Sequence, residues 1–344
     1  MKSQIFFLKQ LPSFKFLLSK TSSKQALVFC DKKLKNSLLL KKWEKNSHLT
    51  FYNLNSGEKT KSLEHLPKHL QKINSLIPDF DKNLTLFIGL GGGSLLDLTG
   101  FIASIYKRGV PFVAIPSTYL SAIDSAHGGK NALNFKKVKN LIGTYHFPQA
   151  VLIIKELLKN NPEHLKESAY GELLKIALIE GGLFYKKLHS HFLKSKQINI
   201  YPFLKQAIKA KMKIVAQDPF EKKSFRLKLN LGHSLGHILE AYHFMDHGRS
   251  VLYGLLFSLR WSYHKKFLNL KNFKEIKKII PIKSKLKKIP LQTFIKYLRQ
   301  DKKHKRNEKL NFIFIKKPGQ VLIKTISEKE MIQEAKRQSL IKNV

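Results

Sequence analysis

The feature that most constrains the fold is an apolar strand that runs into a glycine-rich loop and then into an apolar helix. The strand is predicted at residues 84–88, the loop at residues 89–94 (GLGGGS) and the helix at residues 95–103. This order presents free backbone N–H groups and a helix N-terminus to a phosphate, and glycines let the backbone approach a pyrophosphate closely. Tight turns also use glycines, so the loop gains its weight from its place between strand and helix. It indicates a phosphate-binding loop in an α/β fold.

Further strands are predicted in the first half of the chain, at residues 25–30, 111–115 and 151–154. Ser117 and Thr118 follow the second of these, at the end of the strand where ligands of open α/β sheets bind. Two glycine-bearing segments come next, at residues 123–131 and 139–143. We expect them to be flexible loops, either binding a phosphorylated, hydroxylated ligand or simply solvated.

From residue 161 the apolar periodicity becomes helical. Helices are predicted at residues 161–178, 201–216 and 251–267 and from residue 327, with a small hairpin at residues 310–323. We therefore place a boundary near residues 150–160 and assign residues 1–155 and 156–344 to two domains.

The strongly positive net charge of the chain bears on whether it binds nucleic acid or a small anionic substrate. The net charge of +41 is unusual for an enzyme, and basic proteins often bind nucleic acid. However, the lysines are spread along all 344 residues and no nucleic-acid-binding motif stands out. We expect solvated lysines, a field that attracts an anionic substrate, and no specific nucleic acid. A single cysteine, Cys30, and the lack of a secretory signal or spanning segment predict a cytoplasmic protein without a membrane anchor.

Histidines cluster in the second half of the chain. His233 and His237 are four residues apart and would share one face of a helix, and His247 follows in a turn. Two or three imidazoles and a carboxylate are typical ligands of zinc, although any one of these histidines alone would be unremarkable. Glu172 is a candidate for the carboxylate. The alternative is that Glu172 and Lys175 form an exposed ion pair worth about 0.2–0.5 kcal/mol.

Taken in order, the motifs resemble those of the 3-dehydroquinate synthases, which belong to the sugar phosphate cyclases. The resemblance covers most of the chain, from about residue 56 to residue 303. It rests on the glycine loop ending in Asp97, then Arg108, Pro116-Ser117-Thr118, Asp124, Gly128-Gly129-Lys130, Lys139-Asn140, Gly171-Glu172 with Lys175, Asn230-Leu231-Gly232-His233 with His237, and His247-Gly248.

The resemblance implies an α/β fold, with a Rossmann-like N-terminal nucleotide-binding domain followed by a mainly α-helical C-terminal domain for metal and substrate. It implies a lyase that converts a phosphorylated sugar acid, 3-deoxy-D-arabino-heptulosonate 7-phosphate, into 3-dehydroquinate and phosphate. NAD, which is recycled, and a divalent metal, Zn2+ or Co2+, would be the cofactors. The reaction belongs to the shikimate pathway and so to aromatic amino acid biosynthesis. A homodimer is also implied.

The resemblance also implies roles for particular residues, carried over by motif position. The metal ligands would be Glu172, His233 and His247. The NAD contacts would be Glu58, Lys61, Gly93, Ser94, Leu95, Leu96, Asp97, Ser117, Thr118, Lys130, Lys139 and Asn160. Substrate and catalytic contacts would be Arg108, Asp124, Lys130, Lys139, Asn140, Lys175, Lys211, Arg226, Asn230 and His237, together with Lys302 or Lys303.

Some positions depart from the family pattern. Arg249 stands where Glu is usual, Asn131 stands where Thr is usual, and His127 is unexpected. A cation at position 249 would disfavour a metal if it pointed inward. The rivals of similar fold are another sugar phosphate cyclase and a metal-dependent alcohol or glycerol dehydrogenase, to which the glycine loop is equally suited. A catalytically lapsed, basic protein that binds RNA or a partner is favoured by the charge of +41 and opposed by the intact ligand set.

Overall fold

The computed structural model describes residues 3–21, 23–35, 37–81, 83–136, 138–195, 198–282, 284–300, 304–305 and 309–342. The chain forms two compact units, Met1–Leu165 and Lys166–Val344. The domain boundary predicted between residues 155 and 156 falls at the start of helix α6 (Lys155–Lys159) and stays a prediction. Within the described ranges, no helix is both long and apolar enough to cross a lipid bilayer.

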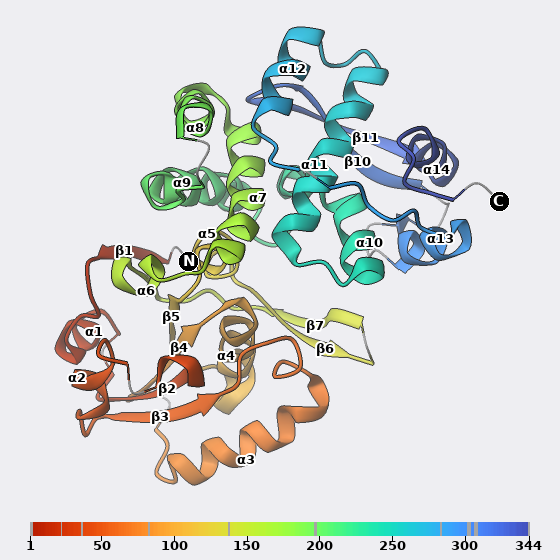
Figure 1. Ribbon diagram of the computed structural model, residues 1–344. Helices are drawn as coiled ribbons and strands as arrows, with labels where there is room; N and C mark the ends of the chain where they lie inside the picture. The colour runs from red at the N-terminus through yellow and green to blue at the C-terminus, as the bar shows by residue number, and fades with distance from the viewer. Residues whose placement is uncertain are drawn as a thin grey trace. The chain divides into compact units, whose positions relative to one another are not determined.

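The first unit is built on a parallel sheet (Figure 1). The strands lie in the order β1 (Gln4–Leu8), β8 (Ala150–Ile154), β5 (Phe112–Pro116), β4 (Thr85–Gly91), β2 (Gln25–Asp31) and β3 (Leu49–Leu54). All neighbouring pairs are parallel. The central strands are buried nearly throughout, as expected of a parallel sheet covered on both faces. They confirm the four strands predicted from the sequence. The edge strands β1 and β3 were not predicted.

Alternate residues of these strands face opposite layers of helices. One face packs against α1 (Phe14–Thr21), α2 (Lys41–Glu44) and α6, in a core that includes Val28, Ile88 and Ile115. The other face presents Phe29 and Phe87, whose ring centroids are 5.3 Å apart. This face is covered by α4 (Gly93–Ile105) and by α3 (Leu66–Leu76), so the strands are enclosed on both sides.

The order of the strands places the glycine loop at a functionally important point. From β2 the chain moves outward to β3, and it then returns to form β4 on the other side of β2. Ligands of open α/β sheets bind at such a reversal, outside the carboxyl ends of the strands. The loop between β4 and α4 lies there. At the end of β2, Asp31 is occupied as a turn former, since its carboxylate accepts a hydrogen bond from the Lys33 N–H at 3.0 Å.

Of the two segments expected to be flexible loops, residues 123–131 mostly form turns, but residues 139–143 lie in an antiparallel hairpin, so the expectation was wrong for the second segment. The strands are β6 (Lys130–Phe135) and β7 (Val138–Tyr145), and β6 packs against α4. Asn131 is buried there and donates hydrogen bonds to the carbonyls of Gly129 and His146, at 3.1 and 2.9 Å. Packing within the unit therefore accounts for Asn131.

His127 is also part of this packing. Its ring is buried, and Nε2 lies 2.8 Å from the carbonyl oxygen of Ala122. Ala122 lies in α5 (Tyr119–Ile123), so the ring serves the end of that helix. Both unexpected residues of this region thus have a local structural role.

The second unit is mainly helical. Its helices are α7 (Glu163–Glu180), α8 (Gly182–Ser195), α9 (Tyr201–Gln217), α10 (His233–His243), α11 (His247–His264), α12 (Leu270–Lys278), α13 (Leu291–Gln300) and α14 (Glu328–Arg337). A small sheet is formed by β9 (His304–Lys305), β10 (Lys309–Lys317) and β11 (Gln320–Ser327). The core joins α10, α11, α13 and α14 to this sheet around Trp261, whose ring centroid is 4.5 Å from that of Phe312. The predicted hairpin and helices are confirmed.

Candidate functional site

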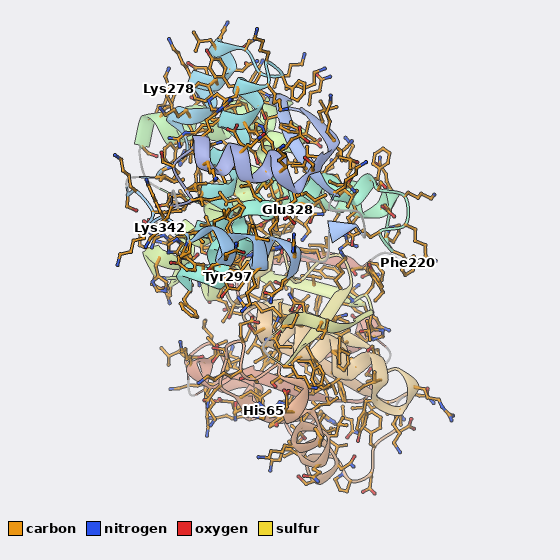
Figure 2. The ribbon with its side chains drawn as sticks, turned by 90° about the vertical axis from the view of Figure 1, so that its right-hand side faces the viewer. His65, Phe220, Lys278, Tyr297, Glu328 and Lys342 are labelled. Carbon is orange, nitrogen blue, oxygen red and sulfur yellow. The ribbon has the colours of Figure 1, made fainter. Side chains whose placement is uncertain are left out.

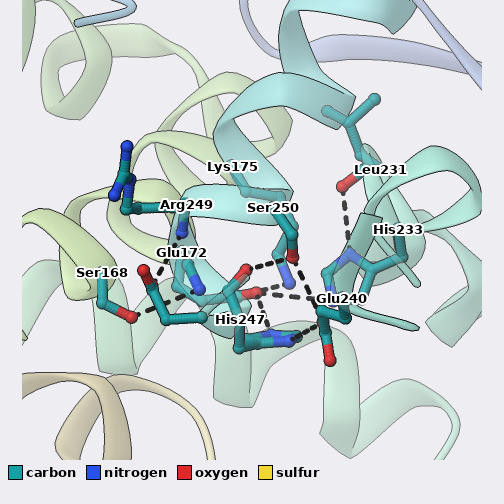
Figure 3. Close-up of polar contacts among 11 residues, drawn as sticks. Ser168, Glu172, Lys175, Leu231, His233, Glu240, His247, Arg249 and Ser250 are labelled. Carbon is teal, nitrogen blue, oxygen red and sulfur yellow. Dashed lines mark hydrogen bonds and ion pairs between the residues drawn. The ribbon is translucent and has the colours of Figure 1, made fainter. Parts of the chain in front are cut away.

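A carboxylate and two imidazoles meet in the second unit. Glu172 comes from α7, whereas His233 and His247 are the first residues of α10 and α11. One possible ligand atom from each lies within 4.8 Å of the other two. The Glu172 Oε1 atom is 3.1 Å from His247 Nε2 and 3.4 Å from His233 Nε2 (Figure 3). This donor set is one that zinc and similar divalent ions use.

The other nitrogen of each ring is fixed by an acceptor. His233 Nδ1 lies 3.2 Å from the carbonyl oxygen of Leu231, and His247 Nδ1 lies 2.7 Å from Oε1 of Glu240 (Figure 3). The same carboxylate oxygen accepts a hydrogen bond from the Ser250 hydroxyl at 3.2 Å. Acceptors at Nδ1 keep a proton there, so each Nε2 atom points toward Glu172 and is the nitrogen that can bind a metal once it is deprotonated. The rings are thus oriented as metal ligands require.

The charges of the cluster are balanced within the protein. Glu172 is fully buried and forms an ion pair with the ammonium group of Lys175, which is also buried. The alternative of an exposed pair is therefore wrong. Burial alone would lower the pKa of His247, but the hydrogen bonds and charges of Glu172 and Glu240 outweigh it and raise the pKa to about 10. A divalent cation can take the place of protons in such a site.

Each of the three possible ligands adjoins a glycine at a close backbone contact. A Cβ on Gly171, beside Glu172, would lie 2.2 Å from the carbonyl oxygen of Gly248, beside His247. A Cβ on Gly248 would lie 1.6 Å from the carbonyl oxygen of Ser168. Gly232, beside His233, contacts Gly254 of α11 through its backbone. A Cβ on Gly254 would lie 1.8 Å from the carbonyl oxygen of Gly232. Main-chain contact therefore holds these segments together at the cluster.

Arg249 does not enter the cluster. Its side chain is exposed and points away from Glu172 and the two histidines (Figure 3). Its backbone N–H is held by the carboxylate of Asp246, the N-cap of α11, at 3.0 Å. The cation that would disfavour a metal if it pointed inward is therefore directed elsewhere.

The other residues of this unit that were predicted to contact the substrate differ in burial and in their place in the fold. The ring centroid of His237 is 5.4 Å from that of His233, so it is a near neighbour of the cluster. Lys211, on α9, and Arg226 are buried, and Asn230 is half-buried at the end of the short helix η4 (Phe225–Asn230). Arg226 donates from Nη1 to the carbonyl of Pro219 at 2.9 Å. Lys302 and Lys303 lie outside the described residues.

In the first unit, a polar cluster forms beside the glycine loop. The Lys61 ammonium donates to Asp97 Oδ2 and to Asn140 Oδ1, at 2.7 Å in each case. The Ser94 hydroxyl donates to Glu58 Oε1 at 2.7 Å. Five residues predicted from separate motifs are thus brought together within this unit.

The pKa values of this cluster follow from burial and from the ion pairs that Lys61 forms with Asp97 and Glu58. Burial raises the pKa of Asp97 to about 6, although the charge of Lys61 opposes the rise. Burial would lower the pKa of Lys61, but Asp97 and Glu58 outweigh it and raise the pKa. Burial would likewise raise the pKa of Glu58, yet the charge of Lys61 and a hydrogen bond from Asn134 hold it below its usual value. The charges of the three side chains thus depend on one another.

The strand end after β5 is held by Asn161, which follows the predicted NAD contact Asn160 in the sequence. Asn160 is exposed, whereas Asn161 is buried. Asn161 donates to the carbonyl of Ser117 at 2.9 Å and accepts from the Tyr119 N–H at 2.9 Å. Thr118 caps α5 through its hydroxyl. The predicted residues Ser117 and Thr118 are therefore fixed by local hydrogen bonds.

The remaining predicted residues of this unit are dispersed. Gly93 opens α4, and Leu95 and Leu96 are buried in its first turn. Arg108 follows the other end of α4, about 20 Å away by the rise of a helix of this length. Asp124 is half-buried at the end of α5, and Lys130 and Lys139 are exposed on the hairpin. Within this unit, Arg108 is thus not brought to the glycine loop.

Two polar residues of these clusters had not been predicted. Glu240 is seven residues after His233 and so lies on the same face of α10, a spacing that could have revealed it. Asn134 donates to Glu58 Oε2 at 2.9 Å and accepts from the Asn140 N–H at 2.9 Å. We find no sequence signal for Asn134, because an asparagine in a strand has many uses.

The fold places the chain among α/β proteins that include sugar phosphate cyclases. It is similar to a structure of 2-deoxy-scyllo-inosose synthase complexed with carbaglucose-6-phosphate, NAD+ and Co2+, with a TM-score of 0.82, 20% identity and coverage of 98% of this chain and 96% of that one. It is equally similar to 2-epi-5-epi-valiolone synthase from Streptomyces hygroscopicus with NAD+ and Zn2+ bound, with a TM-score of 0.82, 19% identity and 98% of each chain covered.

Sequence comparison then gives the family. The models of the 3-dehydroquinate synthase N-terminal and C-terminal regions match residues 51–168 and 169–304. The 3-dehydroquinate synthase of Dictyoglomus turgidum is 34% identical over 286 residues, which cover 80% of this chain and 79% of that protein. The chain belongs to the 3-dehydroquinate synthase family, and is an enzyme of the sugar phosphate cyclase kind.

Proposed function

We propose that the chain converts 3-deoxy-D-arabino-heptulosonate 7-phosphate into 3-dehydroquinate and phosphate, with NAD and a divalent metal as cofactors. The observation that carries the proposal is the convergence of Glu172, His233 and His247 in a member of this family. Both structurally similar cyclases contain NAD+ and a divalent ion, and one contains a phosphorylated sugar analogue. The reaction would serve aromatic amino acid biosynthesis.

The three side chains fit a zinc or cobalt ion. One carboxylate and two imidazoles leave coordination positions for substrate oxygens. When bound, such an ion lowers the pKa of a coordinated hydroxyl and stabilises negative charge on its oxygen. The protein contributes the orientation of the rings, through the acceptors at Leu231 and Glu240, and it excludes water by burying Glu172.

The loop after β4 fits the pyrophosphate of NAD. The N-cap of α4 is Gly92, which offers no side-chain acceptor, so the first backbone N–H groups of this helix remain available to an anion. NAD supplies the capacity to accept a hydride and to return it. Glu58, Lys61 and Asp97 would position the cofactor beside the loop, with Gly93 to Leu96, Ser117, Thr118, Lys130, Lys139 and Asn160 as further contacts.

Basic and amide side chains would hold the carboxylate and phosphate of the substrate. In the second unit these are Lys175, Lys211, Arg226, Asn230 and His237, and in the first unit Arg108, Lys130, Lys139 and Asn140; the carboxylate of Asp124 would instead accept a hydrogen bond from a substrate hydroxyl. Buried cations bind anions strongly because little water screens them. Lys175, Lys211 and Arg226 are buried, which suits them to fix the charged groups while phosphate leaves.

The proposal is tested by phosphate release from the heptulosonate phosphate, with NAD and zinc present and then with each withheld. We expect release that requires both, without net accumulation of NADH. Absence of release from protein that binds NAD and zinc would overturn the proposal in favour of another cyclase or a dehydrogenase. Absence of both release and bound metal would favour a lapsed, basic binding protein, an alternative that the outward direction of Arg249 opposes.

We also propose a homodimer that works in the cytoplasm and binds no specific nucleic acid. The dimer follows from the resemblance to the family, and light scattering of the purified chain tests it. The even spread of lysines supports the last point, since side-chain nitrogens project from both units in the view of Figure 2. The assignment of residues 1–155 to NAD and 156–344 to metal and substrate is part of the same proposal.

Glu240→Gln is expected to weaken zinc binding by about 10–100-fold, the usual effect of losing an outer partner of a metal-ligating histidine. The reason is that Glu240 orients the His247 ring by accepting from Nδ1 at 2.7 Å. Zinc affinity is measured by competition with a chromophoric chelator. Glu275→Gln is a matched control, because Glu275 is a partly exposed carboxylate paired with Lys278 on α12. Equal zinc affinity in the Glu240 variant and the parent would contradict this role.

A further inference from the structure

We propose that the second unit binds a small phosphate ester in a cavity separate from the cluster of Glu172, His233 and His247. The cavity has a volume of about 660 Å³ and lies between the end of α11, the start of α12 and the turn from β10 to β11. Sites for small molecules usually enclose about 300–1,000 Å³. The cavity is therefore of a size that suits a metabolite.

The cavity is remote from the cluster. His247 is the first residue of α11, and His264, which lines the cavity, is the last. A helix rises 1.5 Å per residue, so the two ends are about 25 Å apart. A ligand of ordinary size cannot occupy both places.

Three lysines make the lining of the cavity positively charged. Lys266, Lys316 and Lys317 line it, and none of the described residues that line it is a carboxylate. None of these lysines forms an ion pair with a described acidic residue, whereas the neighbouring Lys265 pairs with Glu330 at 3.2 Å. These three lysines are exposed and have no described carboxylate partner, so they give the cavity a positive potential that favours an anion. The ligand is therefore anionic.

This charge pattern is not simply the result of abundant lysine. A second cavity in the same unit, of about 290 Å³, is also lined by two lysines, Lys213 and Lys228, but it includes Glu180. There the Lys213 ammonium lies 3.5 Å from the Glu180 carboxylate. The larger cavity differs because its lysines lack such a partner.

The other walls indicate the rest of the ligand. Asn269 and Asn272, at the start of α12, add amide groups, and Tyr263 and Phe267 add apolar surface. His264 is held by the Glu334 carboxylate at 2.8 Å and so is not counted among the free cations. Lysine ammonium groups suit phosphate, and the aromatic walls suit an organic body. A phosphate ester combines the two.

One of the lysines occupies a position where glycine is usually found. Lys266 follows α11 with a φ of 58°, and its N–H donates to the carbonyl of Tyr263 at 2.9 Å. Helices often end on a glycine in this left-handed conformation, because a side chain there is unfavourable. A lysine at this position lowers stability relative to glycine.

The test uses the full chain, metal-free and saturated with NAD, at about 0.15 M salt, where long-range charge effects are screened. Inorganic pyrophosphate is titrated by calorimetry into the parent and into the triple variant Lys266→Gln, Lys316→Gln, Lys317→Gln. The control variant, Lys186→Gln, Lys187→Gln, Lys194→Gln, removes the same charge from exposed positions on α8. We expect two classes of site, the substrate site and the cavity, and we expect only the cavity class to be weakened, at least tenfold in the cavity variant and less than twofold in the control. Equal weakening in both variants, or none in the cavity variant, would overturn the proposal.

Two further measurements separate the sources of phosphate and the role of Lys266. The second probe is a short single-stranded RNA. If this RNA binds through the same lysines and pyrophosphate does not bind, the proposal of a small ligand is overturned in favour of a nucleic-acid strand. Lys266→Gly is expected to raise the melting temperature and to weaken pyrophosphate binding, because it removes both the unfavourable conformation and the charge. A higher melting temperature with unchanged pyrophosphate affinity would show that the lysine is incidental and would overturn its part in the site.

Discussion

Glu172→Gln is expected to abolish zinc binding and phosphate release. The substitution keeps the shape of the side chain but removes the only negative charge in the cluster of three possible ligands. Glu172 is the one carboxylate among these three described residues, and its Oε1 atom lies within 3.4 Å of both imidazole Nε2 atoms. Loss of a residue that orients a metal ligand reduces metal affinity by up to about 100-fold. Loss of the ligand itself should reduce the zinc affinity by more than that. Zinc content after gel filtration and chelator competition measure the effect.

The same substitution is expected to lower the free energy of unfolding of the metal-free protein by about 3–5 kcal/mol. The reason is that Lys175 would keep its charge in a buried place without the carboxylate that now pairs with it. The double variant Glu172→Gln, Lys175→Met removes both charges and should recover most of this loss, while zinc binding stays absent. Urea unfolding of the metal-free variants tests the comparison.

These two variants separate a ligand role from a folding role. Zinc binding by the Glu172→Gln protein at the parent affinity would contradict the ligand assignment. A double variant as unstable as the single one would contradict the ion-pair explanation. Recovery of stability without recovery of zinc binding is the result that supports both.

Gly248→Ala is expected to lower the free energy of unfolding by about 3 kcal/mol or more, at the upper end of the cost of overpacking. A Cβ at this position would lie 1.6 Å from the carbonyl oxygen of Ser168. Because that oxygen belongs to the main chain of α7, only a shift of α7 or α11 can relieve the clash. The gain in helix propensity from alanine is only about 1 kcal/mol and does not offset it. The shift would also move His247 relative to Glu172, so zinc affinity should fall with stability.

Gly236→Ala is the matched control for this prediction. Gly236 lies in α10, and a Cβ there would meet its nearest neighbour, the Ser250 carbonyl oxygen, at 3.4 Å, an ordinary contact. We expect unchanged stability or a gain of up to about 1 kcal/mol, with zinc bound as in the parent. Urea unfolding and chelator competition on both variants provide the test. Equal stability of the two alanine variants would show that α7 and α11 can separate at little cost.

The sequence revealed most of the first unit because its strands are buried on both faces and appear as short, continuous apolar runs. The strand before the glycine loop, β4, is buried along its whole length and was easily found. The β6 strand was missed because one of its inward positions is an asparagine. Asn131 and Leu133 are buried on one side of β6, but only the leucine contributes to an apolar alternation. The hairpin was therefore not predicted, and residues 139–143 of its second strand were taken for a loop.

The site was only partly predictable, for a different reason. His233 and His247 are close in sequence, and their clustering is a local signal. Glu172 comes from another helix, and nothing in its spacing distinguishes it from other glutamates, so the resemblance to a family was needed to select it. That its partner Lys175 is buried depends on the packing of whole helices. Glu240 could have been found from helical spacing alone, but the sequence analysis looked for ligands and not for the groups that orient them.

The glycines beside the three possible ligands have a consequence for the evolution of the chain. Where two main chains touch, their separation is set by peptide atoms, and larger neighbouring side chains have little influence on it. Core residues such as those around Trp261 can then drift among apolar types of similar volume, at a cost that is usually below about 1.5 kcal/mol each, without changing how far apart the ligands lie. Gly171, Gly248 and Gly254 have no such freedom. A metal centre built in this way is insulated from neutral change in the core that surrounds it.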